Sequence, residues 1–175
     1  MDVNRIRSIR DPYFAEAWRI YNDNFPFVER RTIKHQEVAF EDEKCHFELF
    51  TEGDKPIGMT CYWLFDEYLY VEHLAIDKTN QGGGYGTKLL DFFLKTSPGL
   101  VILEIEPVID DLTTRRLHFY ERFGFQKNDH YHVLVPYHDS TPNDMEMVLM
   151  TYPKTINKAL FDKFVKDLRV IVMRK

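Results

Sequence analysis

The feature of this sequence that most constrains its fold is a glycine-rich loop at residues 81–86, between a strand-like and a helix-like segment. Residues 67–77 have the composition of a strand, and residues 87–96 continue as an apolar helix. Where a strand leads into a helix, the free N–H groups of the first turn and the helix dipole favour a bound anion. Glycine lets the backbone approach that anion closely. The loop therefore predicts a phosphate-binding site.

Two common phosphate-binding motifs are excluded by the spacing of these glycines. The dinucleotide fingerprint G-x-G-x-x-G requires a third glycine where this chain has Thr87 or Leu89. A Walker loop requires Lys directly after its second glycine and then Ser or Thr, whereas Lys88 follows Thr87 and precedes Leu89. The loop belongs to neither class.

Turn signals and apolar periodicity predict a mixed α/β domain with a central sheet flanked by helices, in the order βααβββαβαββα. Residues 1–153 are expected to form this domain, with residues 154–175 as a C-terminal helical extension packed on it. The run at 100–105 is almost wholly apolar, so we expect it at the centre of the sheet. Strands are predicted at residues 3–9, 46–52, 56–65, 67–77, 100–105, 125–135 and 145–152, and helices at residues 11–24, 32–43, 87–96, 111–123 and 155–173.

Composition and charge exclude several classes of partner. A net charge of -5 argues against a nucleic-acid-binding protein, which would carry a basic surface. The chain shows no signal-peptide core, and no apolar run approaches the ~20 residues that span a bilayer. Cys45 and Cys61 are too few for a disulfide framework, so a cytoplasmic protein with reduced thiols is expected. The arginine pairs at 30–31 and 115–116 are interpreted as solvated surface.

Two motifs together resemble one known family. The first is Q/R-x-x-G-x-G/A, filled by Gln81, Gly84 and Gly86, and the second is F-Y-x-x-x-G-F, which runs from Phe119 to Phe125. In this order they resemble the GCN5-related N-acetyltransferase (GNAT) family over residues 3–152. The resemblance implies the acyl-CoA N-acyltransferase (GNAT) fold, acetyl-CoA as acyl donor and no metal.

The resemblance also implies which residues hold the cofactor. The CoA pyrophosphate is expected at the loop, and the pantetheine arm is expected to pair with the backbone of the preceding strand. Many members carry Asn seven residues before the tyrosine of the second motif, where this chain has Thr113. The expected cofactor-binding residues are Leu74, Ala75, Ile76, Gln81, Gly82, Gly83, Gly84, Tyr85, Gly86, Thr87 and Thr113.

Acyl transfer to an amine needs one group that protonates the departing thiolate and one that removes a proton from the amine. The resemblance gives the first role to Tyr120, because a phenol with a pKa of about 10 is protonated at neutral pH. Amines of similar pKa are mostly ammonium ions at neutral pH, and Glu72 is the expected base. His73, Glu104 and Glu106 compete for that role. Simple strand alternation places Glu72 and His73 on opposite faces of their strand.

In the family, the acceptor amine lies near the loop between the first two helices, here residues 24–31. The side chains of that loop fit an apolar group, an ammonium ion or a carboxylate. His130 and His132 share a predicted strand face, but no carboxylate or cysteine ligand is placed with them, so no metal site is predicted. The expected acceptor-binding residues are Phe25, Phe27, Glu29, Arg30 and Glu106.

The sequence therefore predicts an enzyme that moves an acetyl group from acetyl-CoA to a primary amine of a small molecule or peptide, by direct attack in a ternary complex. The alternative is a non-catalytic acyl-CoA-binding sensor or regulatory module with the same fold. The apolar stripe of the terminal helix, at residues 156–168, covers the core or forms a homodimer interface. No nucleic acid or membrane partner is predicted. The acceptor, the donor's acyl chain length and the oligomeric state stay open.

Overall fold

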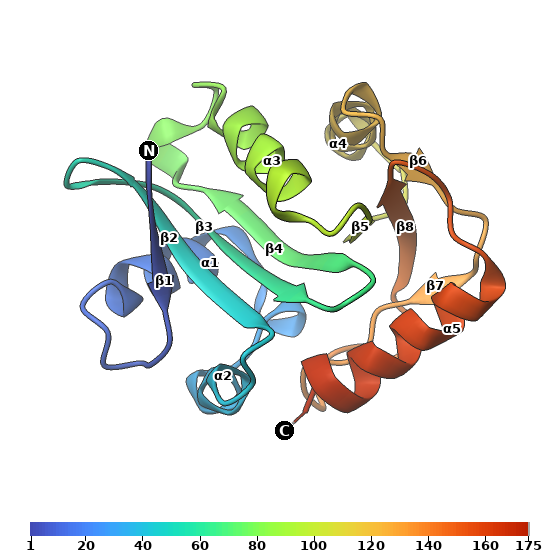
Figure 1. Ribbon diagram of the computed structural model, residues 1–175, viewed down its shortest axis with the longest axis horizontal. Helices are drawn as coiled ribbons and strands as arrows, with labels where there is room; N and C mark the ends of the chain where they lie inside the picture. The colour runs from blue at the N-terminus through green and yellow to red at the C-terminus, as the bar shows by residue number, and fades with distance from the viewer. Residues whose placement is uncertain (175) are drawn as a thin grey trace.

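The computed structural model describes residues 1–174, and its centre is a mixed sheet of eight strands (Figure 1). The strand order is β1-β2-β3-β4-β5-β8-β6, with β7 paired to β8. The β4–β5 pair is parallel and the other pairs are antiparallel. The strands are β1 (Asp2–Ile6), β2 (Cys45–Glu52), β3 (Lys55–Leu64), β4 (Leu69–Ile76), β5 (Val101–Ile105), β6 (Gln126–Lys127), β7 (His132–Val133) and β8 (Glu146–Tyr152).

Helices cover both faces of this sheet and bury an apolar core on each (Figure 1). On one face, α1, α2 and α5 pack with Trp63 of β3, and on the other, α3 and α4 pack with Val71 of β4. This arrangement confirms the predicted α/β class. The helices are α1 (Phe14–Asn24), α2 (Ile33–Phe40), α3 (Tyr85–Thr96), α4 (Asp111–Arg122) and α5 (Lys158–Asp167), with short turns η1 (Phe27–Glu29), η2 (Lys78–Asn80) and η3 (Leu168–Val172).

The C-terminal helix belongs to the core of the same chain. Phe161, Phe164 and Leu168 are buried with residues of α1 and of the sheet. Asn157 caps the helix, because its Oδ1 accepts a hydrogen bond from Leu160 N at 3.0 Å. The apolar stripe is therefore covered within the chain and is not exposed as an interface. Beyond Asp167 the helix widens into the π-helical turn η3.

The predicted strand at 125–135 is wrong in its middle, where residues 128–131 separate β6 from β7. The buried side chain of Asn128 accounts for this break. Its Nδ2 donates to Thr151 Oγ1 at 2.8 Å and its Oδ1 accepts from Ile156 N at 2.9 Å, so these bonds hold the chain out of a regular ladder. His130 and His132 consequently do not lie on one strand. No helix within residues 1–174 is both long and apolar enough to cross a membrane.

Candidate active site

The site begins where β4 and β5 separate. Their parallel pairing extends from Leu69 opposite Val101 to Val71 opposite Leu103, and both strands then continue unpaired with each other. A cavity of about 620 Å³ lies there. Within residues 1–174 no strand pairs with this edge of β4 beyond Val71, so its backbone groups are available to a ligand, apart from the Ile76 carbonyl, which accepts from Gln81 Nε2 at 3.3 Å. The cavity is lined by Asn24, Phe25, Pro26, Glu29, Val71, Glu72, His73, Leu74, Ala75, Ile76, Gln81, Leu103, Glu104, Ile105, Glu106, Leu112, Arg115, Arg116, Phe119, Tyr120, Leu134, Tyr137 and Met147.

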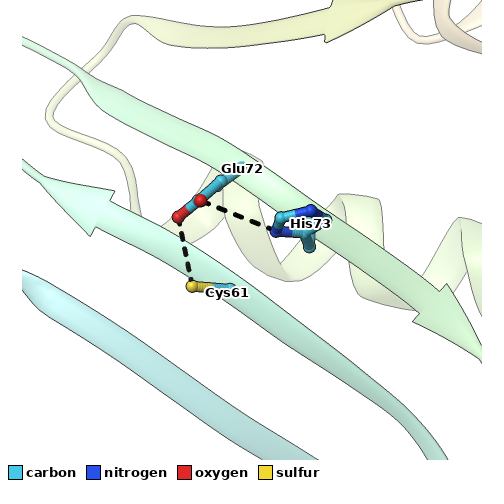
Figure 2. Close-up of side chains that lie close together, drawn as sticks. All are labelled: Cys61, Glu72 and His73. Carbon is cyan, nitrogen blue, oxygen red and sulfur yellow. Dashed lines mark hydrogen bonds and ion pairs between the residues drawn. The ribbon is translucent and has the colours of Figure 1, made fainter. Parts of the chain in front are cut away.

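A β-bulge at Glu72 changes which face its side chain occupies. The pairing with β3 passes from Tyr62 opposite Val71 to Cys61 opposite His73, so Glu72 has no partner in the register. The carboxylate of Glu72 lies 3.8 Å from His73 Nδ1, on the same face (Figure 2). The expectation from simple alternation, that the two residues face opposite ways, is therefore wrong.

Glu72 is held in a buried ion pair with Arg31. Nη1 of Arg31 lies 2.6 Å from Glu72 Oε1, and the glutamate side chain has no exposed surface. Its Oε2 also accepts from Trp63 Nε1 at 2.8 Å and from Cys61 Sγ at 3.3 Å. Burial raises the pKa of the Glu72 carboxyl, but the charges of Arg31 and His73 and the hydrogen bonds from Arg31 and Trp63 together outweigh it, and the pKa lies below its ordinary value. This geometry does not favour Glu72 as a base.

Arg31 connects three parts of the chain. Besides Glu72, its guanidinium contacts the carbonyl oxygen of Val172 in η3, to which Nη2 donates at 2.7 Å. It lies over the rings of Trp63, at 5.6 Å, and Tyr137, at 5.8 Å. Only 3% of its side chain is exposed, so the interpretation of Arg31 as solvated surface is wrong. The loop after α1 is thereby fixed to the β4 bulge and to the C-terminal turn.

Cys61, Glu72 and His73 place a thiol, a carboxylate and an imidazole within 4.8 Å of one another (Figure 2). Such donors can bind zinc. The guanidinium of Arg31 already supplies the positive charge next to Glu72, and a metal ion would have to displace this buried cation. His73 Nε2 donates to the carbonyl oxygen of Glu29 at 2.9 Å, which fixes its ring. We therefore assign this cluster to the support of the cavity wall.

A second buried carboxylate, Glu104 on β5, has different partners. Its Oε2 accepts from the hydroxyl of Tyr70 on β4, and its Oε1 accepts from Nε2 of His132 on β7. Burial and the adjacent Glu104 hold the pKa of the Tyr70 phenol well above its ordinary value, so the phenol stays a donor. The side chain of Glu104 is 7% exposed, and this residue lines the cavity.

Tyr120 reaches the same cavity from α4, on the other face of the sheet. Within residues 1–174 no side chain or backbone group forms a hydrogen bond with its hydroxyl. Burial is the main reason that the pKa of Tyr120 rises to about 12, with Glu106 adding to the effect and Arg116 opposing it. The hydroxyl is therefore protonated across the physiological range and free to donate.

The glycine loop borders the cavity through Gln81. Gly84 is the N-cap of α3 with φ of 76°, and Gly82 has φ of 83°, so both adopt the left-handed conformation that favours glycine. Asp77 fixes the preceding turn by accepting from Thr79 N at 2.9 Å. The first N–H groups of α3 have no intrahelical acceptor. The loop thus presents donors to an anion, although Gln81 alone among the loop residues lines the cavity.

Thr113 is engaged in the cap of α4. Its Oγ1 donates to Asp110 Oδ1 at 2.7 Å and accepts from Ile109 N at 3.0 Å, and its backbone N–H donates to Asp110 Oδ1 at 2.8 Å. A hydroxyl satisfied in this way has little capacity left for the pantetheine arm. The capping role accounts for Thr113 without the cofactor contact predicted from the sequence.

The loop between α1 and α2 contributes to the cavity in part. Phe25 and Glu29 line it, and so does Glu106, which is paired with Arg116. Phe27 and Arg30 stay outside the lining, with the Arg30 guanidinium 5.7 Å from the Phe27 ring centre. Burial raises the pKa of the Glu29 carboxyl above its ordinary value.

Sequence reasoning did not identify Arg31, Tyr70 or His132 as parts of the site. Tyr70 lies two residues before Glu72 and reads as an ordinary core strand residue. His132 meets Glu104 across 28 residues of sequence, through a pairing of short strands that local periodicity does not indicate. Only contacts between distant elements place these three residues at the site.

Comparisons with known proteins identify the family of this chain. Residues 4–125 match the model of the acetyltransferase (GNAT) family. YjbC of Bacillus subtilis (strain 168), named as an acetyltransferase, is 28% identical over 107 residues, which are 60% of this chain and 54% of YjbC. A protein of Bacillus subtilis subsp. natto named as a spermine N(1)-acetyltransferase is 33% identical over 110 residues, 55% of this chain and 72% of that protein.

A solved structure extends the likeness to the whole fold. The protein from Bacteroides thetaiotaomicron, assigned to the GNAT acetyltransferases, superposes with a TM-score of 0.85 at 26% identity. The match covers 99% of this chain and 98% of that one, so it includes the C-terminal helix. By contrast, the chain spans only about half the length of YjbC.

Proposed function

Because this chain belongs to the acetyltransferase (GNAT) family, we propose that it transfers an acetyl group from acetyl-CoA to a primary amine of a small molecule or peptide. The observation that carries the proposal is the cavity between β4 and β5, lined by Tyr120 from one face of the sheet and Glu104 from the other. Donor and acceptor can then meet from opposite faces, in a ternary complex with direct attack.

The cofactor lies along the opened side of β4 in this proposal. The pantetheine arm adds to the strand at Leu74, Ala75 and Ile76, in the manner of an added β-strand. The pyrophosphate lies at the loop from Gln81 to Thr87, where the start of α3 offers N–H donors and the positive end of its dipole. Side chains of the loop would be secondary to its backbone.

The chemistry requires a neutral amine and a thiolate that leaves. Tyr120 would donate its hydroxyl proton to the sulfur as the carbon–sulfur bond breaks. A phenol with a pKa of about 12 is a weak acid towards a solvated thiolate. In the same buried site, burial raises the pKa of the CoA thiol. The pKa values of the phenol and of the thiol therefore lie closer together than they do in water.

An amine acceptor is supported by the charge of the cavity. Among residues 1–174, Glu29 and Glu104 line it without an ion pair to an arginine or lysine, whereas Glu72 and Glu106 are paired with Arg31 and Arg116. A cationic acceptor would find negative charge that no direct ion pair to an arginine or lysine neutralises at the first two residues. The name of the Bacillus subtilis subsp. natto relative, a spermine acetyltransferase, points to the same class of acceptor.

The proposal is tested by following free thiol from acetyl-CoA with a panel of amines, amino acids, polyamines and peptides. We expect at least one amine to release thiol faster than the amine-free control, with the acetylated amine detected by mass spectrometry. Tight CoA binding with no turnover for any amine would contradict an enzyme and favour the binding module.

A further inference from the structure

Glu104 and its partners form a buried unit at the acceptor side of the cavity. Tyr70 comes from β4, Glu104 from β5 and His132 from β7, and both carboxylate oxygens accept hydrogen bonds. Val71 opposite Leu103 is the last paired position of β4 and β5, so Glu104 is the first β5 residue beyond the pairing. Its partner on the other side is Leu149 of β8, which carries no charge. Glu104 thus lies where the two strands separate, and it lines the cavity there.

The charge of Glu104 is not balanced by a permanent cation. Among residues 1–174, its ion-pair partner is the imidazole of His132, and a tyrosine hydroxyl is its other donor. Glu72, by contrast, has the Arg31 guanidinium. A buried carboxylate whose partners carry no permanent charge gains from a cation that enters the site.

Resting on the proposed function, we propose that Glu104 binds the ammonium group of the acceptor and accepts its proton. Tyr70 and His132 are positioning residues that hold the carboxylate towards the cavity. The site then selects acceptors that enter as alkylammonium ions, and it generates the neutral amine next to the thioester.

The protons and bonds balance in this step. The ammonium nitrogen carries three protons, and the first passes to Glu104 before the nitrogen attacks the carbonyl carbon. As the carbon–sulfur bond breaks, Tyr120 gives its proton to the sulfur and recovers one from the nitrogen, whose last proton remains on the amide. Glu104 then releases its proton to solvent, so the products are the amide, CoA thiol and one proton.

The C-terminal helix gains a function from this assignment. Phe164 of α5 packs against Tyr70, with ring centres 5.2 Å apart, and against His132, at 5.9 Å. Phe161 packs edge to face on His132, at 5.8 Å. Both donors to Glu104 are thus fixed by α5, which lies beside β7 in Figure 1.

The chain contains a matched control for this unit. Glu48 on β2 is also buried, accepts from Tyr62 Oη at 3.0 Å and has His46 Nδ1 at 3.4 Å. It lies in the continuous pairing of β2 with β3 and does not line the cavity. Glu48→Gln therefore replaces a buried carboxylate with similar neighbours by an amide, at a position outside the cavity.

The test uses the best amine of the panel and compares Glu104→Gln with Glu48→Gln. For Glu104→Gln we expect kcat/KM for the amine to fall by about 100-fold or more at pH 7, with CoA binding retained. The ratio of wild-type to variant activity should shrink as the pH approaches the pKa of the amine, about 10, because solvent then removes the proton. Glu48→Gln should stay within about threefold of wild type.

Three results would overturn the assignment: full activity of Glu104→Gln, equal losses in both variants, or a ratio that does not change with pH. If Glu104→Gln fails to bind CoA, Tyr70→Phe removes one donor at nearly constant volume. Unchanged kinetics and an unchanged pH profile for Tyr70→Phe would also overturn it. Absence of turnover in the wild-type protein would instead reject the proposed function, so the two failures are distinguishable.

Discussion

Glu72 and Glu104 are both buried carboxylates beside one cavity, but they differ in what balances their charge. Glu72 faces the Arg31 guanidinium at 2.6 Å, whereas Glu104 accepts from a tyrosine and a histidine. The first pair is complete without a ligand and the second lacks a fixed cation. Burial alone therefore does not mark a reactive carboxylate; the charge of its partners separates a supporting residue from a candidate base.

The largest expected effect is a loss of stability on removing Arg31, the cation that distinguishes Glu72 from Glu104. Arg31→Met leaves the Glu72 carboxylate buried and uncompensated, so we expect the free energy of unfolding at pH 7 to fall by about 3–5 kcal/mol. The lowered pKa of Glu72 means that this stabilisation is present above its ordinary pKa of 4.5 and is lost as the pH falls through the folded-state value. Urea unfolding at several pH values measures the difference.

The double variant Arg31→Met with Glu72→Gln is the control. It removes both charges while an acceptor remains for Trp63 Nε1, so it should recover a large part of the lost stability. A double variant no more stable than Arg31→Met would show that the ion pair is not what distinguishes Glu72.

Tyr120→Phe tests whether the residue that protonates the thiolate is distinct from the residue that deprotonates the amine. We expect kcat to fall by about 100-fold. The pKa of Tyr120 is about 12, so the loss should be constant from pH 6 to 10, unlike the pH-dependent loss expected for Glu104→Gln. Steady-state kinetics across that range measure both.

Tyr152→Phe is the matched control for Tyr120→Phe. Both tyrosines pack against Phe125, with ring centres 5.6 Å away for Tyr120 and 5.7 Å away for Tyr152, but Tyr152 does not line the cavity. Its variant should keep wild-type kinetics. Equal losses in the two variants would assign the effect to packing.

The smallest expected effect concerns the cofactor end. Gly84→Ala introduces no clash, because a Cβ there meets nothing within 4 Å, but its φ of 76° strains an alanine by about 1 kcal/mol. We expect calorimetry to show weaker CoA binding for Gly84→Ala than for the wild-type protein. The pH dependence of kcat/KM for the amine should stay unchanged. Gly53→Ala, at φ of 59° in the β2–β3 turn, is the control for strain alone. Equal CoA affinities in both variants would contradict a role for the loop.

Local pattern predicted the parts of the fold that local forces determine. The meander, the glycine loop and α3 were found at residues 45–96 because turn residues, alternation and apolar periodicity coincide there. The match to the GNAT family confirms the resemblance stated from the two motifs. The roles of Tyr120 and of the loop residues stay predictions.

Long-range contacts account for what the sequence did not reveal. Nothing in the run around Glu72 indicates a bulge, so alternation assigned the wrong face to its side chain. Its partner Arg31 lies 41 residues away, and the arginine pair at 30–31 looks like any solvated pair. The Asn128 contacts that break the predicted strand likewise reach residues 151 and 156. Each depends on how distant elements pack.

The most direct test of the difference between Glu72 and Glu104 is a crystal structure with CoA and the best amine of the panel, a combination that cannot react. We predict the amine nitrogen bound to the Glu104 carboxylate, directly or through one water, with the CoA sulfur beside the Tyr120 hydroxyl. An amine bound to Glu72 with the Arg31 ion pair broken, or an amine outside the opening between β4 and β5, would contradict this account.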